Sequence, residues 1–234
     1  MSLEHWRKIQ RERGNILAAE TASHLLSLYG DVPFPLTEGS YDLQEFRPFT
    51  DQEKEALKND GAVIYELSEE TIEDQLRAGK PISLTKDIGD RVLKLPSMSG
   101  EVAIYPSPIK FYIPDSRNKT LQNQEELAKR DSRQLRRRLG HDSLTVIIPE
   151  QASTLTQIAF KHYDETGVWL FHESIYYTNI RGVYGRTKNP VNSTGSKTAD
   201  VGHLDTEEGF RVRSLIRNYG SRNTLVVRVI VAKK

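Results

Sequence analysis

The hydrophobic pattern of this chain of 234 residues changes its period near Gly167. Before Gly167, apolar residues recur every three, four or seven positions, as they do on one face of an α-helix. After it, short segments show the near-alternation of apolar and polar residues that is typical of half-buried β-strands. The pattern predicts an α+β fold. N-terminal helices and a βαβ unit would be followed by a mainly antiparallel C-terminal sheet, all packed as one mixed unit.

The helix expected over 120–139 has the clearest pattern. Leu121, Ala128 and Leu135 recur every seven residues, and Gly140 provides a typical helix end. The segment 109–113 before it and the fully apolar segment 144–148 after it both look like strands. Together the three segments predict a right-handed βαβ crossover with parallel strands.

The other expected elements are assigned from capping residues and from apolar runs between Gly and Pro. Helices are expected at 50–59, where Thr50 and Glu53 form a capping box, at 68–79 and at 153–164. Strands are expected at 62–67, 91–95, 101–105, 175–178, 183–187, 199–204, 210–215 and 225–231.

The domain organisation follows from the same pattern. We expect one globular domain over 1–234, with an N-terminal helix over 3–29 and a proline-containing linker over 31–49. A subdivision into an α/β part, 50–166, and an antiparallel part, 167–234, is an alternative. The apolar face of the helix 3–29 would pack on the core or on a second copy of the chain, so a homo-oligomer is one expected partner arrangement.

Composition removes several classes of site. The chain has no cysteine, which excludes disulfides, thiolate zinc sites, iron–sulfur ligation and cysteine nucleophiles. Its six histidines do not follow a metal-binding spacing, so we expect neither a metal nor a cofactor. No apolar run approaches the ~20 residues of a membrane span, and the first residues do not resemble a signal peptide. We therefore expect a cytoplasmic protein that does not bind a membrane.

The net charge of +1 conceals an uneven distribution of charge. Residues 31–80 hold 13 acidic and 5 basic side chains, whereas residues 181–234 hold 4 acidic and 11 basic ones. The two regions would face each other in the fold or an oligomer. Alternatively, the basic region would hold an anionic small molecule or a polyanion.

Three segments are candidates for binding an anion. The first is the polar loop 186–198, whose Arg186, Lys188, Ser196 and Lys197 could surround an anion; the alternative is a solvated loop. The second is the helix start at Ser153 and Thr154, directly after the strand 144–148, where free N–H groups favour an anion; a plain N-cap is the alternative.

The third segment is the basic run over 129–138, which holds six cations and the single acid Asp131. Arg133, Arg136 and Arg137 are the residues that we expect to contact a polyanion. The alternative is a solvated helix end, whose cations complement the helix dipole.

Catalytic residues are not specified by any motif in the sequence. His203 and Asp205, near a predicted strand end, are weak candidates for an acid–base pair. With Arg186 they would suit a hydrolase or transferase that acts on a phosphorylated or acidic small molecule. No Gly-x-Ser-x-Gly nucleophile elbow is present.

One segment resembles a known module. Residues 144–179 contain Leu-Thr-Val-Ile-Ile, Ser153-Thr-Leu-x-x-Ile-Ala, His162-Tyr-Asp, Trp169 and Asn179 in an order similar to a LysM module. The resemblance implies a βααβ unit that binds N-acetylglucosamine polymers or serves as a phage-type structural module. The Gly-Asp of that pattern is replaced by Ala152-Ser153. The leading interpretation remains a non-catalytic binding module for an anionic ligand or partner.

Overall fold

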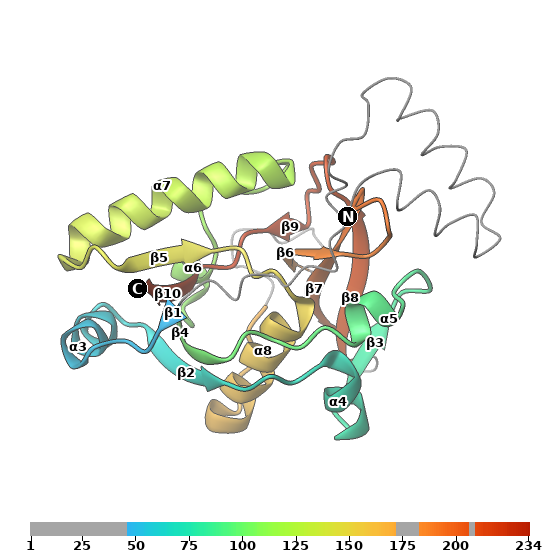
Figure 1. The fold of residues 1–234 in the computed structure, drawn as a ribbon, viewed down its shortest axis with the longest axis horizontal. Coiled ribbons are helices and arrows are strands. Elements are labelled where there is room, and N and C mark those ends of the chain that lie inside the picture. Colours follow the sequence, from blue (N-terminus) through green and yellow to red (C-terminus); the bar gives the residue numbers. More distant parts are fainter. Residues whose placement is uncertain (1–45, 172–182, 206–208) are drawn as a thin grey trace. The chain divides into compact units, whose positions relative to one another are not determined.

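The computed structural model describes residues 46–171, 183–205 and 209–234, without the side chains of residues 203–205 (Figure 1). The residues from Glu45 to Lys234 form one compact unit. The predicted helix 3–29, the strand 175–178 and residues 31–45 of the predicted linker lie outside the described residues. Phe46 and Arg47, near the end of that linker, form the short strand β1.

The first sheet has five strands, all paired antiparallel. Its order is β1 (Phe46–Arg47), β10 (Val229–Lys233), β4 (Gly100–Ile104) and β2 (Val63–Leu67), and β5 (Leu144–Ile147) also pairs with β10. Ile230 of β10 pairs with Ala103 of β4 and with Val146 of β5. The strand β10 therefore lies between β4 and β5.

The βαβ unit has a different form from the expected one. Its first strand is β4, its helix is α7 (Leu121–Leu139) and its second strand is β5. Because both strands run antiparallel to β10, they are parallel to each other with β10 between them, which makes a split βαβ unit. The expected parallel pairing of 109–113 with 144–148 is therefore wrong.

Two predicted strands are short helices instead. Residues 109–113 fall largely in α6 (Pro108–Phe111), which begins with Pro108 because the fixed φ of proline suits the first helical turn. Only Tyr112 of this segment forms an isolated bridge, with Val227. Residues 91–95 fall largely in α5 (Asp90–Leu93), because a segment with so few apolar residues does not distinguish a strand from a helical turn.

The second sheet confirms the mainly antiparallel C-terminal part. Its order is β3 (Ile82–Leu84), β8 (Gly209–Ile216), β7 (Lys197–Asp205), β6 (Tyr184–Pro190) and β9 (Thr224–Leu225). The central pairs β6–β7 and β7–β8 are antiparallel, and the outer pairs β3–β8 and β6–β9 are parallel. The predicted strand 225–231 is divided, since Leu225 belongs to this sheet and Val229 to the first one.

The main helices follow their capping signals. The helix α3 (Asp51–Asn59) has the expected capping box of Thr50 and Glu53, and α7 runs from the N-cap Thr120 to Gly140, whose φ is 75°. The helix α4 (Ile72–Arg77) begins at the N-cap Thr71 rather than at Ser68, and α8 spans Ala152–Thr166. None of the helices in the described ranges combines the length and apolarity needed to cross a membrane.

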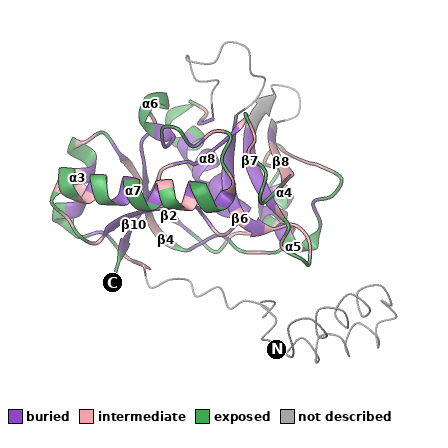
Figure 2. Cartoon of the chain, turned by 90° about the horizontal axis from the view of Figure 1, so that it is seen from above, coloured by how far each residue is buried: buried purple, intermediate pink, exposed green. Residues whose placement is uncertain are grey.

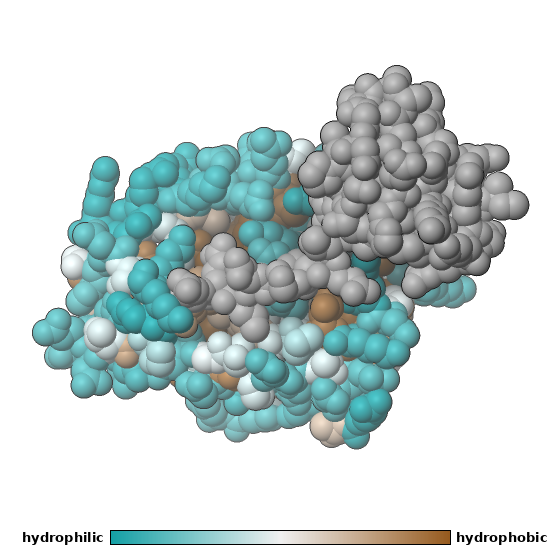
Figure 3. Space-filling view, in the orientation of Figure 1, coloured by the Kyte–Doolittle hydropathy of each residue, from teal (hydrophilic) through white to brown (hydrophobic). Residues whose placement is uncertain are grey.

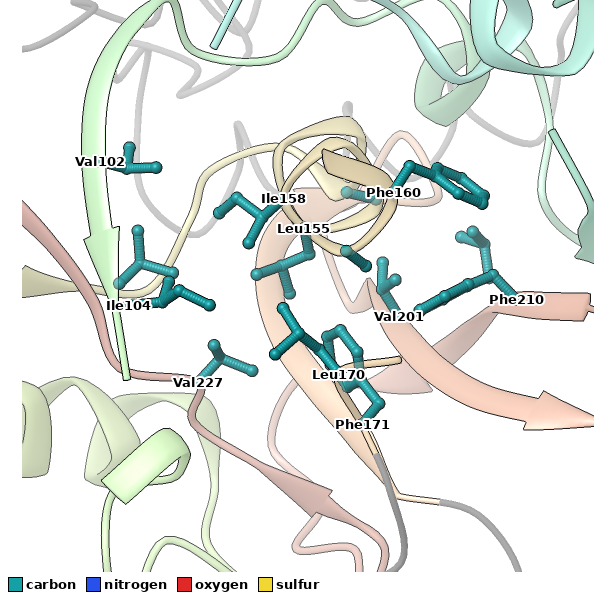
Figure 4. Packing of buried hydrophobic residues seen from close by; sticks show 14 of the residues in the cluster. Val102, Ile104, Leu155, Ile158, Phe160, Leu170, Phe171, Val201, Phe210 and Val227 are labelled. Carbon is teal, nitrogen blue, oxygen red and sulfur yellow. The ribbon is translucent and has the colours of Figure 1, made fainter. Parts of the chain in front are cut away.

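The core lies on both faces of the first sheet. On one face, α8 packs between the two sheets, with Leu155 and Ile158 in a cluster that includes Val102 and Phe210 (Figure 4). On the other face, α3 and α7 cover a second cluster, and α7 lies along β5 (Figures 1 and 2). Alternate residues of β4 and β10 enter the two clusters, which is why both strands are almost entirely apolar. The α+β class is thus confirmed.

Candidate functional site

The predicted anion loop 186–198 is a β-hairpin, made of β6, a turn over 191–196 and the start of β7. Arg186 is fully buried in β6. Its guanidinium donates hydrogen bonds to Gln124 Oε1 at 2.9 Å and to the Tyr219 carbonyl oxygen at 3.2 Å. Arg186 is thus part of the interior of the second sheet, where it is not accessible to a ligand of the hairpin.

A buried carboxylate accompanies Arg186. Asp200 of β7 is fully buried, and its two carboxylate oxygens lie 3.9 Å from the guanidinium nitrogens of Arg186 and Arg213. Thr224 donates a hydrogen bond to Asp200 Oδ2 at 2.8 Å. Burial raises the pKa of Asp200 to about 6, although both arginines act to lower it. Burial also lowers the pKa of Arg186. These groups form a charge cluster inside the fold.

The two lysines of the hairpin have acidic partners. Lys188 Nζ lies 2.8 Å from Glu150 Oε1 and 3.5 Å from Glu125 Oε1, and Lys197 Nζ lies 3.2 Å from Asp87 Oδ2. The Ser196 hydroxyl hydrogen-bonds to Asn192 and Thr194 within the turn. The structure therefore does not bring Arg186, Lys188, Ser196 and Lys197 together around one anion site.

The helix start at Ser153 and Thr154 is buried and its polar groups are occupied. The N-cap is Gln151, and Asn189 of β6 accepts a hydrogen bond from the Ala152 N–H at 3.1 Å. The Ser153 hydroxyl donates to the Leu95 carbonyl oxygen at 2.9 Å, and Thr154 Oγ1 accepts from the Met98 N–H at 3.1 Å. Both side chains hold the segment 95–98 against α8.

His203 and Asp205 lie on β7, and their side chains are outside what the structure describes. Their catalytic role stays a prediction, although Arg186, the third residue of that hypothesis, lies in the buried charge cluster. The LysM resemblance also stays a prediction. Its first half is β5 and α8, while Asn179 and part of the expected second helix lie outside the described residues.

The basic run on α7 separates into two groups. Several of its cations are held by neighbours: Arg138 forms an ion pair with Asp60 at 2.8 Å, Lys129 pairs with Glu126 at 2.7 Å, and Arg136 donates to the Ser132 carbonyl oxygen at 3.3 Å. The single acid, Asp131, pairs with the distant Arg228 at 2.6 Å. It is therefore engaged away from the arginines of its own run.

The second group consists of Arg130, Arg133 and Arg137, all exposed. Their spacing of three and four residues places them on one stripe of α7. Among residues 46–171, 183–205 and 209–234, no side chain forms a hydrogen bond or ion pair with any of the three. Of the residues predicted to contact a polyanion, Arg133 and Arg137 belong to this stripe, whereas Arg136 is held by the backbone. Hydrophilic side chains cover the α7 region in Figure 3.

Two adjoining hollows lie beside this stripe. The smaller hollow, about 370 Å³, is lined by Lys119, Asn123, Glu126, Leu127, Arg130 and Arg133. The larger one, about 820 Å³, shares Lys119, Leu127 and Arg130 with it. The larger hollow also reaches α6 and the segment 112–119, and Val183 and Leu225 line it as well. We call the smaller hollow the anion pocket and the larger one the apolar groove.

Long-range contacts fix the walls of the two hollows. Arg228 donates to both carboxylate oxygens of Asp131 on α7 and to the Lys110 carbonyl oxygen on α6, which ties the two helices together. The segment 112–119 is held by the Asn118 N–H, which donates to the Ser221 carbonyl oxygen at 3.1 Å, and by Gln124, which donates to the Ser116 carbonyl oxygen at 2.8 Å. These contacts place Lys119 beside Arg130.

The charges of the anion pocket favour a negative ligand. Lys119, Arg130 and Arg133 face a single carboxylate, Glu126, which already pairs with Lys129. Within the described part of the chain, Lys119 also has no hydrogen bond or ion pair. Tyr112, which lines the apolar groove, has a buried hydroxyl without a hydrogen-bond partner among the described residues. Burial raises the pKa of Tyr112, and the charge of Arg117 acts in the opposite direction.

Sequence reasoning included Arg133 but missed Lys119, Arg130 and Tyr112 as site residues. The basic run contained Arg130. Whether Arg130 is left without an ion pair depends on tertiary contacts of the neighbouring side chains, which the sequence does not report. No local signal marked Lys119 or Tyr112. Among the described residues, no cluster of three or more His, Asp or Glu side chains could hold a metal ion. Comparisons of the chain with protein-family models, with curated proteins and with solved structures found no match.

Proposed function

We propose that the protein is a non-catalytic binding module whose anion pocket holds the phosphate or carboxylate group of its ligand. The observation that carries the proposal is the set of three cations, Lys119, Arg130 and Arg133, that line one hollow without partners among the described residues. Within the described ranges, none of the three compensates a carboxylate of the fold, so their charges are available to a ligand there.

The pocket would recognise an anion mainly through charge. Two arginines offer planar donors that fit phosphate or carboxylate oxygens, and Lys119 adds a mobile ammonium group. Because all three side chains are exposed, their attraction is screened by salt. Affinity should therefore be modest and should fall as ionic strength rises.

Inorganic tripolyphosphate is a suitable probe, and isothermal titration calorimetry at 20 and 200 mM NaCl gives the affinity. The test variant combines Lys119→Gln, Arg130→Gln and Arg133→Gln. The matched control combines Lys58→Gln, Lys86→Gln and Lys234→Gln, which removes the same charge at exposed sites away from the pocket.

We expect the wild-type protein and the control to bind tripolyphosphate, with about tenfold weaker binding at the higher salt concentration. The pocket variant should lose at least another factor of ten, since each charge-assisted contact contributes about 1 kcal/mol or more. Equal binding by the pocket variant and the control would overturn the proposal.

A further inference from the structure

We propose that the ligand of this site is an anion with an aliphatic chain, and that the apolar groove holds the chain. This inference rests on the proposed function, because the anionic group of the ligand would occupy the anion pocket. The two hollows share Lys119, Leu127 and Arg130, so a single molecule can extend from one into the other.

The size and lining of the apolar groove suit part of a small molecule. Its volume of about 820 Å³ lies in the range that is typical of ligand sites. Besides Tyr112 and five charged or amide residues, its lining consists of aliphatic residues and prolines: Pro108, Ile109, Ile113, Pro114, Leu127, Val183 and Leu225. Ile109 is 59% exposed, so it is an apolar side chain of this lining that a ligand can reach.

The lining favours an alkyl chain over a planar base. Nucleobase sites use aromatic faces on which the bases stack. Tyr112 is the one aromatic residue of this lining, and its ring packs edge-on against Phe111 at 4.7 Å between ring centroids. A flexible chain of methylene groups can follow aliphatic walls without such a face, and burial of each methylene is favourable.

The proposed ligand would also account for Tyr112, a lining residue of the groove and one of the buried side chains that have an unsatisfied polar atom. Tyr112 is 6% exposed and its hydroxyl has no hydrogen-bond partner in the described structure. A buried hydroxyl without a partner costs free energy, so such groups are rare in folded proteins. An oxygen of the ligand that accepts from this hydroxyl would satisfy it. Arg117, Lys119 and Arg130 make the same groove electropositive, whereas Asp115 is its single acidic residue.

The probes are inorganic phosphate, octyl phosphate and decyl phosphate, used below the concentrations at which the alkyl phosphates form micelles. Decyltrimethylammonium, which has the same chain and the opposite charge, is the comparison. We expect decyl phosphate to bind more tightly than octyl phosphate, by about fourfold for each added methylene if the chain is fully buried. Inorganic phosphate and decyltrimethylammonium should bind much more weakly than decyl phosphate.

Two variants test whether the alkyl chain of the ligand lies in the apolar groove. Ile109→Ser removes apolar surface from an exposed position. It should weaken the binding of decyl phosphate about fivefold and leave the binding of tripolyphosphate unchanged. Tyr112→Phe should weaken decyl phosphate by a similar factor, yet leave thermal stability equal or higher, since it removes an unsatisfied buried hydroxyl. The control is Tyr219→Phe, at an exposed tyrosine that does not line the groove.

The outcomes separate the two proposals. If tripolyphosphate binds but decyl phosphate binds no more tightly than inorganic phosphate, the aliphatic ligand is overturned and the anion pocket stands. If decyltrimethylammonium binds as tightly as decyl phosphate, the groove does not select an anion and the inference is also overturned. If the control with Lys58→Gln, Lys86→Gln and Lys234→Gln loses tripolyphosphate binding, that result would instead count against the proposed function.

Discussion

At the scale of single residues, Glu53 shows how one side chain combines local and distant roles. Its carboxylate accepts a hydrogen bond from the Thr50 N–H at 2.7 Å, which completes the capping box. The same carboxylate forms an ion pair with Arg47 at 2.7 Å and accepts from the Ser143 hydroxyl. Glu53 is 2% exposed, and chiefly the hydrogen bond from Arg47 lowers its pKa to about 2.

We predict that Glu53→Gln lowers the free energy of unfolding at pH 7 by about 2 kcal/mol, less than the full pKa shift implies because Arg47 is partly exposed. The stabilisation is present above the ordinary pKa of a glutamate and is lost as the pH falls toward about 2. Urea unfolding at pH 7 and pH 2.5 measures it. Glu55→Gln, at an exposed position of the same helix, is the control, and equal losses in both variants would contradict the prediction.

At the scale of elements, the pairing of β6 with β7 depends on one glycine. Gly202 of β7 pairs with Tyr184 of β6. A Cβ atom placed on Gly202 would lie 2.2 Å from the Val183 carbonyl oxygen and 2.8 Å from the Tyr184 Cα. Both are backbone atoms, so a side-chain rotation cannot relieve the overlap.

We predict that Gly202→Ala destabilises the protein by about 3 kcal/mol, because the two strands must move apart for the methyl group. Gly89→Ala is the matched control, since nothing lies within 4 Å of a Cβ at that position. Thermal unfolding of both variants, followed by circular dichroism, is the measurement. A melting temperature of Gly202→Ala within one degree of that of the control would contradict the predicted overlap.

Elements with strong local signals were predictable from the sequence. The helix α7 combines a heptad of apolar residues with the N-cap Thr120 and the αL residue Gly140, so its bounds agree closely with the expectation. The elements at 108–111 and 90–93 carried no such signals, and their short apolar runs fit a strand equally well. The pairing of β4 and β5 through β10 depends on residues far apart in the sequence, which local patterns do not report.

The candidate site was likewise predictable only in the part that has a local sequence signal. The basic run on α7 was visible in the sequence, but the free arginines could not be told from the paired ones. Two tertiary ion pairs make that distinction. Asp60 pairs with Arg138 of the run, and the one acid of the run, Asp131, pairs with the distant Arg228. Both pairs join different elements, and the buried Arg186 shows that a cation in a polar segment can equally belong to the core.

At the scale of the whole molecule, stability should depend on pH through two opposed effects. Between about pH 4 and pH 6 the folded state retains the proton on Asp200 that the unfolded state releases, so the free energy of unfolding falls by about 2 to 3 kcal/mol as the pH rises. Below that window, protonation of Glu53 and Asp87, whose pKa values are both about 2, removes stability as the pH falls.

We therefore predict a maximum of stability near pH 4 to 5. Chemical unfolding at half-unit steps from pH 3 to pH 8 measures the profile. Asp200→Asn should abolish the decline between pH 4 and pH 6, whereas Asp87→Asn should leave that decline intact. A decline that persists in Asp200→Asn would show that another group is responsible.

The position of β10 has a consequence for how the molecule is made. This strand occupies the gap between β4 and β5, yet it is the last strand of the described chain to leave the ribosome. Until β10 is synthesised, β4 and β5 each have an unpaired edge. Contacts of such high sequence separation also form slowly. We therefore expect the first sheet to close late, when β10 pairs with two strands that are already synthesised.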